Sequence, residues 1–518
     1  MRTITVCLSF VLAAAGAGPG TRELSRAELR DRIEGAWAGQ MIGVSYGAPT
    51  EFKAQGKILE GELPAWTPGR VSNSLGQDDL YVDMTFAKVL DDKGLGATSA
   101  DFGAMFRDSK YSLWHANMEG RRALKRGVPG SLSGSPKYNA HANDIDFQIE
   151  ADFIGVMTPG LFQSSNDIAL RAGRVMNYGD GIYGGMFVSC MYAAAFFEKD
   201  PRKVVEAGLA CIPKKSPYAI LITDVLGWHK QNPSDWKKTW QLLHDKWDKD
   251  DACPVGALTD FNIDAKLNGG FIALGLLYGD RDFFKTIDIS TRAGQDSDCN
   301  PASAGGILGV MLGYRAIPDQ WKGGIPAIAD QKFRFTDFSF RTIVDSTEKR
   351  ALQMIQKTGG RVEGDKIAVK LQSARPPKLE IWDPGRPVER IRTGDARWTW
   401  KGAWKESQDK RRDGVPRGVK TASEKGAEAV LSFEGTGVMI SGGYLPGGGA
   451  ADVYLDGKLN RKIDVFSDSD GARGGNAIWH TWGLKNGKHT VRLVVRGEPF
   501  GESKGTNISI DDAILFRP

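Results

Sequence analysis

From residue 24 to residue 313 the chain has the hydrophobic periodicity of α-helices. Ser25 and Glu28 form a capping box, S-x-x-E, at the start of the first predicted helix. The apolar residues that follow on one helical face are Leu29, Ile33, Ala36, Trp37 and Met41. Residues 183–197 and 268–278 are apolar on nearly every side, which predicts two buried central helices. Asn300 before Pro301 is predicted to cap a further helix, whose small residues would allow close packing.

After Asp345 the pattern changes from helical to strand-like. Residues 347–356 are predicted to form a last helix. Residues 453–459 and 483–495 then contain an Asp-Gly and an Asn-Gly turn beside short alternating runs. Further strands are expected at 430–433, 438–441 and 508–516. The predicted fold class is therefore multidomain. An all-α domain (21–345) and a connector (346–375) precede an all-β sandwich of the galactose-binding-like or carbohydrate-binding-like type (376–518).

Composition agrees with a globular protein and excludes several classes. Of 518 residues, 41% are hydrophobic and 25% charged, which argues against a disordered chain, a coiled coil or a polytopic membrane protein. Lys plus Arg is 68 and Asp plus Glu is 63, a net charge of +5. Because nucleic-acid binding needs a concentrated basic face, no nucleic-acid partner is expected.

The N-terminus has the pattern of an export signal over residues 1–20. Arg2 is followed by a mostly apolar run from Ile4 to Gly18 that closes on small residues and is too short to span a membrane. The alternative is a buried first helix. No other segment is long enough for a membrane span, so we expect a secreted or periplasmic protein.

Five cysteines are present: Cys7, Cys190, Cys211, Cys253 and Cys299. Cys7 would leave with the signal, and the other four are unevenly spaced without a CxxC pair, so their spacing does not suggest zinc. Export permits a disulfide, but the sequence does not assign one.

Two acidic motifs carry candidate chemistry. The first is Gln77-Asp78-Asp79, and the second is Asp296-Ser297-Asp298-Cys299, directly before the predicted helix at Asn300. Carboxylates brought together repel unless they are protonated or bridged by a cation, and Mg²⁺ or Mn²⁺ prefers such oxygen ligands. Each motif alone is equally typical of a helix cap.

With the segment EGAWAGQMIGVSYGAPTEF (34–52), the motifs QDDLYVDM (77–84) and AGQDSDCNPASAGGILGVMLG (293–313) resemble the ADP-ribosylglycohydrolase family, which includes DraG-like and J-crystallin-related proteins. The acid-rich segment 143–155 resembles the family's exported bacterial branch, which often carries attached β-domains. The resemblance implies an all-α domain, one or two Mg²⁺ or Mn²⁺ ions and hydrolysis of a glycosidic bond. It implies metal binding by Asp78, Asp79, Asp296 and Asp298, with Glu51 over the site. Val44, Gln77, Leu80 and Cys299 depart from the family's acid and hydroxyl residues.

Further polar residues are candidates for substrate contact. Asp144, Asp146, Glu150 and Asp152 crowd one segment, where a helix would place Asp146 and Glu150 on one face. The alternative for this segment is a solvated acidic face. His115 and Asn117 follow Trp114 in a polar–aromatic cluster of the kind that sugar sites use. Asp180 precedes the buried helix at 183, either as a substrate contact or as a helix cap.

Together these features predict an exported, metal-dependent glycosidase that cleaves an N- or O-glycosidic bond of an extracellular glycan or glycoside. Asp79 or Asp296 would activate water, with Glu150 as the alternative base. Two other functions remain open: hydrolysis of ADP-ribosyl bonds, and a non-catalytic glycan-binding or structural role. Trp398, Trp400 and Trp404 suggest either a sugar- or polyanion-binding surface or packed tryptophans in a connector. The oligomeric state is not predicted.

Overall fold

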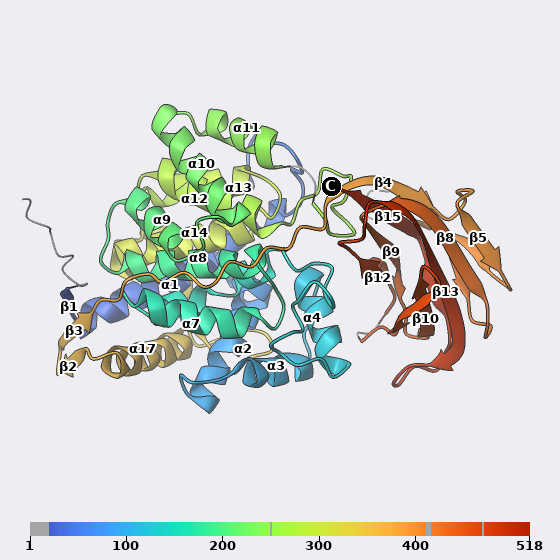
Figure 1. The fold of residues 1–518 in the computed structure, drawn as a ribbon. Coiled ribbons are helices and arrows are strands. Elements are labelled where there is room, and N and C mark those ends of the chain that lie inside the picture. Colours follow the sequence, from blue (N-terminus) through green and yellow to red (C-terminus); the bar gives the residue numbers. More distant parts are fainter. Residues whose placement is uncertain (1–19, 249–250, 411–415, 469–470) are drawn as a thin grey trace, which may run out of the picture.

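A computed structural model describes residues 20–248, 251–410, 416–468 and 471–518, which form a helical domain followed by a β-domain (Figure 1). Apart from Gly20, the predicted export signal lies outside the described residues. Within the described part of the chain, no helix is both long and apolar enough to cross a membrane.

The helical domain consists of a set of helices around one apolar core. Its helices are α1 (Arg26–Gly47), α2 (Asp78–Lys93), α3 (Ser99–Asp108), α4 (His115–Lys125), α5 (Asp146–Ile149), α6 (Asp152–Val156), α7 (Phe162–Gly173), α8 (Asp180–Ala195), α9 (Pro201–Ala210), α10 (Pro217–Gln231), α11 (Trp236–Trp247), α12 (Ala265–Gly279), α13 (Phe283–Arg292), α14 (Cys299–Leu312), α15 (Asp319–Lys322), α16 (Ile325–Ile328) and α17 (Phe340–Lys357), with short 3₁₀ turns η1 (Ala48–Thr50), η2 (Pro68–Gly76) and η3 (Tyr314–Ala316). The predicted buried helices correspond to α8 and α12, and the capping box of α1 is confirmed.

Helices α1 and α14 pack with their backbones almost in contact. A glycine stripe along α1, Gly35, Gly39, Gly43 and Gly47, faces α14 and the loop before it. A Cβ on Gly39 would lie 2.1 Å from the carbonyl oxygen of Gly305, so no larger side chain fits without moving the helices. The predicted close packing is confirmed, and it brings the end of α1 against the second acidic motif.

The predicted cap of α14 is wrong by two residues. The N-cap is Asp298, not Asn300, and the helix begins at Cys299. Pro301 therefore lies in the first helical turn, where proline is tolerated because amides there have no intrahelical acceptor. Asp298, the second acid of the motif, is therefore part of the N-terminus of α14.

A small sheet closes the helical domain at the chain's start and end. Strand β1 (Thr21–Ser25) pairs antiparallel with β3 (Lys366–Lys370), which also pairs with β2 (Arg361–Glu363). Ile367 and Val369 belong to the core of the helical domain. The segment 346–375 thus contains part of α17 and two strands, before the chain runs in extended form toward the β-domain (Figure 1).

The β-domain is a sandwich of antiparallel sheets with a shared apolar core, which confirms the predicted fold class. One sheet has the order β11-β10-β13-β8-β5, the other β12-β9-β15-β4, and a third small sheet β14-β7-β6. The strands are β4 (Arg386–Arg392), β5 (Trp398–Lys401), β6 (Lys405–Lys410), β7 (Pro416–Ala422), β8 (Glu428–Gly435), β9 (Gly437–Tyr444), β10 (Gly449–Leu455), β11 (Lys458–Asp464), β12 (Arg473–Thr481), β13 (Gly487–Pro499), β14 (Ile508–Ile510) and β15 (Asp512–Arg517). The Asp-Gly turn joins β10 to β11, with both turn residues at positive φ as the hairpin requires.

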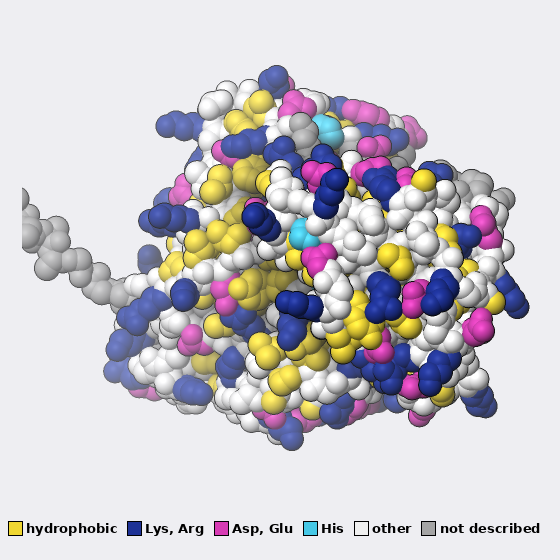
Figure 2. Space-filling model, turned by 45° about the vertical axis from the view of Figure 1, so that its right-hand side comes forward, with side chains coloured by type: hydrophobic (Ala, Val, Ile, Leu, Met, Phe, Trp, Pro, Cys, Tyr) yellow, Lys and Arg dark blue, Asp and Glu magenta, His cyan; other side chains and the backbone are white. Residues whose placement is uncertain are grey.

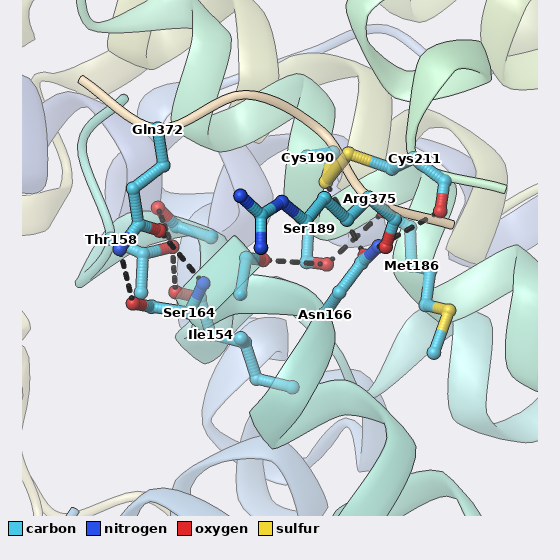
Figure 3. Close-up of a disulfide and its surroundings, with 12 residues drawn as sticks. Ile154, Thr158, Ser164, Asn166, Met186, Ser189, Cys190, Cys211, Gln372 and Arg375 are labelled. Carbon is cyan, nitrogen blue, oxygen red and sulfur yellow. Dashed lines mark hydrogen bonds between the residues drawn. A yellow bond between two sulfur atoms is a disulfide. The ribbon is translucent and has the colours of Figure 1, made fainter. Parts of the chain in front are cut away.

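A disulfide joins Cys190 in α8 to Cys211 at the end of α9 (Figure 3). Asn166 donates hydrogen bonds to the carbonyl oxygens of Cys211 and Arg375, at 2.8 and 3.3 Å. Gln372 pairs with Ser164 nearby. The disulfide region therefore also anchors the extended segment that leads to the β-domain.

Specific contacts hold the two domains together. Arg126, the C-cap residue of α4, pairs with Asp464 and Asp468 of the β-domain, at 2.6 Å each. The Tyr444 hydroxyl donates to Glu119 at 2.6 Å. From β4, Arg390 donates to two backbone carbonyls of the helical domain. The β-domain is thus docked onto α4 and onto the loop that follows residue 250.

Candidate functional site

The loops that carry the two acidic motifs are locked together by backbone hydrogen bonds. The amide of Phe52 donates to Gln295 O at 3.1 Å, and the amide of Gln295 donates to Ala54 O at 2.9 Å. Phe52 and Gln295 both have positive φ, 54° and 53°, which costs free energy for residues with a side chain. This strained pairing places Glu51 beside the loop of Asp296.

The structure brings four of the predicted acids into one centre. Ligand atoms of Glu51, Asp296 and Asp298 lie within 4.8 Å of one another, and so do those of Asp79, Asp298 and Cys299. Asp298 is common to both groups. Asp79, Asp296 and Asp298 are at most 3% exposed, whereas Glu51 is exposed. Within the described residues, Asp78 belongs to neither group and is half-buried.

Burial and mutual repulsion make these carboxylates costly when charged. Burial, with the charges of Asp298 and Asp78, raises the pKa of Asp79 well above its ordinary value. Burial, with Asp298 and Glu51, does the same to the pKa of Asp296. Burial raises the pKa of Asp298 to about 6. A divalent cation would remove this cost.

The donor set fits such an ion. Within the described part of the chain, Asp79 Oδ1 is buried without a hydrogen-bond partner, as expected of an oxygen reserved for a ligand. The Cys299 thiol lies 3.4 Å from Asp79 Oδ2, where a hydroxyl would add an oxygen ligand. The group of Glu51, Asp296 and Asp298 is all oxygen, which suits a hard cation, and the other contains a soft sulfur.

A second layer of acids lies behind Asp79. Asp152 accepts a hydrogen bond of 2.8 Å from Gln40 of α1, and Asp83 accepts from the amide of Phe153. The sequence placed Asp83 one helical turn beyond Asp79 in the first acidic motif, but it did not point to Gln40. The signal for Gln40 is its place among the small and apolar residues of α1, where a polar side chain is buried. A buried amide needs hydrogen-bond partners, so such a glutamine indicates a polar group packed against the helix.

The acid-rich segment does not form one helix, contrary to the expectation that Asp146 and Glu150 share a helical face. It forms α5 and α6, interrupted after Ile149, and a tertiary acceptor takes an amide in the first turn of each short helix. The Phe147 amide donates to Asn177, and the Phe153 amide to Asp83. The alternative of a solvated acidic face is also wrong. All four acids of the segment are buried: Asp144, Asp146, Glu150 and Asp152.

Asp146, Asn117 and Glu150 form a connected group. The carboxylate of Asp146 accepts from the amides of Ala116 and Asn117 at the start of α4. The Asn117 side chain donates to Glu150. Burial raises the pKa of Asp146 to about 7 and that of Glu150 well above its ordinary value, with Asp146 as the next cause for Glu150. Burial and the nearby carboxylate of Asp146 therefore disfavour the charged form of Glu150.

The remaining candidates lie elsewhere. His115 and Asp144 lie in a separate buried group with His141 and Cys253. Asp180 is the first residue of α8, after the N-cap Gly179. Burial raises the pKa of Asp180 to about 7, while Lys266 lowers it. The structure thus divides the predicted site residues among four places: the acid centre, the layer of Asp152 behind it, the group of Asp146, Asn117 and Glu150, and the group of His115 and Asp144, with Asp78 and Asp180 apart.

The tryptophans at 398, 400 and 404 pack against one another. Trp398 and Trp400 are stacked with ring centroids 5.1 Å apart, and Trp404 meets Trp400 at 4.8 Å. All three indole N–H groups donate to backbone carbonyls. The packed alternative is therefore correct for these residues, although they lie in and beside strand β5 rather than in a connector.

A separate hollow of about 900 Å³ lies between the two domains. Its aromatic lining residues are Tyr138, Trp382, Tyr444, Trp479, His480 and Trp482. On the face of the molecule shown in Figure 2, basic and acidic side chains are intermixed over both domains.

Comparison with known proteins identifies the helical domain. Residues 25–354 match the family model of ADP-ribosylglycohydrolase. A curated relative, the A type blood alpha-D-galactosamine galactosaminidase of Flavonifractor plautii, is 32% identical over 106 residues, which are 20% of this chain and 9% of that protein. The chain therefore spans only a small part of that relative.

Two solved structures show weaker similarity. One is an ADP-ribosylglycohydrolase-related protein complex, with 17% identity, coverage of 63% of this chain and 99% of that chain, and a TM-score of 0.38. The other is the carbohydrate-binding module CBM36 in complex with calcium and xylotriose, with 10% identity, coverage of 24% and 98%, and a TM-score of 0.15. Since the family model spans well over half of the sequence and includes both acidic motifs, the chain belongs to the ADP-ribosylglycohydrolase family.

Proposed function

We propose that the chain is an exported, metal-dependent hydrolase that cleaves the N- or O-glycosidic bond of an extracellular glycan or glycoside. The observation that carries this proposal is the convergence of Glu51, Asp79, Asp296 and Asp298 at one partly accessible centre. The unpartnered, buried Asp79 Oδ1 supports cation binding within it. The family is one of hydrolases that are typically metal-dependent.

In this proposal Asp79, Asp296 and Asp298 hold Mg²⁺ or Mn²⁺. Such an ion would orient sugar hydroxyls and stabilise developing negative charge as a Lewis acid. Glu51, the exposed acid of the group, contacts the substrate at the mouth of the centre. Asp296 is favoured over Glu150 as the group that accepts a proton from the attacking water, because Asp296 lies with Glu51 and Asp298 in the acid centre, whereas Glu150 belongs to neither of its groups among the described residues.

The departures from the family pattern bear on the number of ions. Leu80 is fully buried in the helical core, and Cys299 offers sulfur where an oxygen ligand would lie. We therefore propose one firmly held ion at Asp296 and Asp298, on the side of Glu51, and a weaker position at Asp79 beside Cys299. Restoring a hydroxyl with Cys299→Thr is expected to tighten Mg²⁺ binding, measured by calorimetric titration, and unchanged binding would contradict this assignment.

Two observations favour an extracellular substrate and a secreted or periplasmic location. The Cys190–Cys211 disulfide is typical of proteins from oxidising compartments. The interdomain hollow offers aromatic faces such as Trp382 and Trp482, of the kind that sugars stack on.

Hydrolysis of an ADP-ribosyl bond is the second candidate function, favoured by membership of the family. A non-catalytic glycan-binding role is the third, favoured by the sulfur at Cys299.

The test is hydrolysis by the purified full chain with Mg²⁺, with Mn²⁺ and with a chelator. The substrates are extracellular glycans, aryl glycosides and ADP-ribosylated protein. Asp298→Asn is expected to abolish turnover, and Asp319→Asn, whose side chain is 93% exposed, is the matched control. Turnover that survives both the chelator and Asp298→Asn would refute the metal-dependent proposal, and ADP-ribosyl hydrolysis alone would favour the second candidate.

A further inference from the structure

A second cluster of potential metal ligands is built from three separate segments of the helical domain. Ligand atoms of His115, His141, Asp144 and Cys253 all lie within 4.8 Å of one another. His141 Nδ1 is 2.6 Å and His115 Nδ1 is 3.6 Å from Asp144 Oδ2. His141, Asp144 and Cys253 are at most 3% exposed, and the His115 side chain is 20% exposed. The cluster shares no residue with the aspartate centre.

We propose that these four side chains bind one Zn²⁺ ion at a structural site. Two imidazole nitrogens, one carboxylate and one sulfur form a four-ligand set of the kind that Zn²⁺ takes in closed tetrahedral sites. Bond lengths in such sites put neighbouring ligand atoms roughly 3.3–3.8 Å apart, so small side-chain shifts suffice. Mg²⁺ is a poor fit, because hard cations prefer oxygen ligands.

Charge also balances at this cluster. A thiolate from Cys253 and a carboxylate from Asp144 together neutralise the charge of one Zn²⁺, while both imidazoles bind as neutral groups. The ion and its four ligands then carry no net charge as a unit, which a low-dielectric interior favours. Zn²⁺ binding would therefore offset the negative charges of Asp144 and Cys253.

The backbone around the cluster is arranged to present these ligands. His115 has φ of 43°, a conformation that is costly for a non-glycine residue and that recurs at functional positions. Its ring stacks on Phe261 with centroids 5.8 Å apart. The amide of His141 donates to Asn139, whose own side chain donates to Ala116 O at 2.9 Å. Two of the ligands are therefore held in place by neighbours that are not ligands.

The loop that carries Cys253 is held in a similar way. The amide of Gly256 donates to Cys253 Sγ at 3.2 Å, a contact that stabilises negative charge on sulfur. The amide of Cys253 donates to Asp251 at 2.9 Å. From the β-domain, Arg390 donates to Pro254 O at 2.5 Å and to Ala257 O at 2.8 Å. The ion would thus fasten the loop on which the β-domain docks.

Metal content of the purified full chain tests the proposal. After dialysis against Zn²⁺ and removal of loose metal, the wild type is expected to retain one Zn²⁺ per chain by plasma mass spectrometry. Cys253→Ser and His141→Gln are expected to lose it. Asp298→Asn is expected to keep it, because the aspartate centre is separate. His244→Asn is the matched control, since His244 pairs with Asp248 at 3.0 Å but lies outside the cluster.

Cobalt supplies a second readout, and its first result is obtained on the wild type without any variant. Co²⁺ bound by the wild type is expected to show a thiolate-to-metal charge-transfer band in the near ultraviolet, since Cys253 is a ligand. The band is expected to persist in Cys299→Ser, which removes the other free thiol. A wild type without the band, or a band that survives Cys253→Ser and vanishes in Cys299→Ser, would overturn the proposal.

Discussion

Replacing Asp298 by Asn is expected to make the metal-free protein more stable than the metal-free wild type. With a divalent ion bound, the variant is expected to be the less stable of the two. Asp298 belongs to both acid groups of the centre, and burial raises its pKa from 3.8 to about 6. Between these values the folded chain keeps a proton that the unfolded chain has released. The free energy of unfolding therefore falls as the pH rises through this range, and the loss is complete above the folded pKa.

The magnitude follows from the two pKa values. Each pH unit between them corresponds to about 1.4 kcal/mol, so the ionised Asp298 costs about 3 kcal/mol above pH 6 when no metal is present. Asn carries no charge and keeps an oxygen that can accept the contact from Cys299. The metal-free Asp298→Asn variant should thus exceed the metal-free wild type in stability by up to about 3 kcal/mol at neutral pH. The difference should vanish toward about pH 4.

Adding Mg²⁺ should reverse the order. An ion that binds only the folded state stabilises it by about 2.7 kcal/mol at a concentration about 100-fold above Kd. The wild type should gain this amount, while Asp298→Asn should gain little because both acid groups lose a ligand. Asp78→Asn should retain most of the gain, since Asp78 lies in neither group of the described residues.

Urea denaturation with Mg²⁺ and with a chelator, at about pH 5 and about pH 8, gives the four free energies needed for each protein. Two results would refute the reasoning. One is a metal-free Asp298→Asn variant that is less stable than the metal-free wild type at about pH 8. The other is an equal gain of both proteins from Mg²⁺, which would mean that Asp298 is not a ligand.

Three further predictions concern the scaffold of the site. Replacing both Cys190 and Cys211 by Ser, which opens a loop with a sequence separation of 21, should lower the free energy of unfolding by about 3 kcal/mol in non-reducing urea denaturation. No change would mean that the bond does not restrain the unfolded chain. Asp180→Asn should raise the free energy of unfolding above about pH 7 and flatten its pH dependence between about pH 4 and pH 7, because the raised pKa of Asp180 penalises its charged form. Parallel pH profiles of the variant and the wild type would contradict this. Gly39→Ala should cost about 1–3 kcal/mol and weaken Mg²⁺ binding, since its Cβ would lie 2.1 Å from a carbonyl oxygen of α14. Gly227→Ala, on an exposed helix face with nothing within 4 Å, is the control that should not destabilise.

The sequence was sufficient for those parts of the fold whose signals are local. The apolar helices α8 and α12, the capping box of α1 and the Asp-Gly hairpin each depend on residues close together in the chain. The sheet of β1, β2 and β3 was not predicted. Strand β1 lies directly before the capping box, and β2 and β3 fall in the predicted connector, where only Ile367 and Val369 alternate as a buried strand would. Short strands of this kind gain their stability from pairing rather than from their own pattern.

Contacts between distant segments had to be seen in the structure. The aspartates of the two motifs could be placed together only through the family resemblance, since more than 200 residues separate them. His141 and Cys253 had no such guide, and a histidine and a cysteine so far apart in the chain have no recognisable metal-binding spacing. The break between α5 and α6 was also missed, and the contact beside it is again distant in sequence: the amide of Phe153 donates to Asp83 on α2, 70 residues away.

The position of the acids at helix termini explains how the fold tolerates them and why it still needs a cation. Asp79 lies in the first turn of α2, and Asp298 is the N-cap of α14, so both face the positive end of a helix dipole. That interaction is worth about 0.3–1 kcal/mol at an exposed site and up to about 2 kcal/mol in partly buried geometry. Burial and mutual repulsion nevertheless raise the pKa of both groups, so the dipoles reduce the cost without cancelling it. The remaining cost is removed when a positive charge binds among these acids, at the meeting point of α1, α2 and α14. The binding of a cation is therefore the best explanation for the presence of these acids in a buried centre.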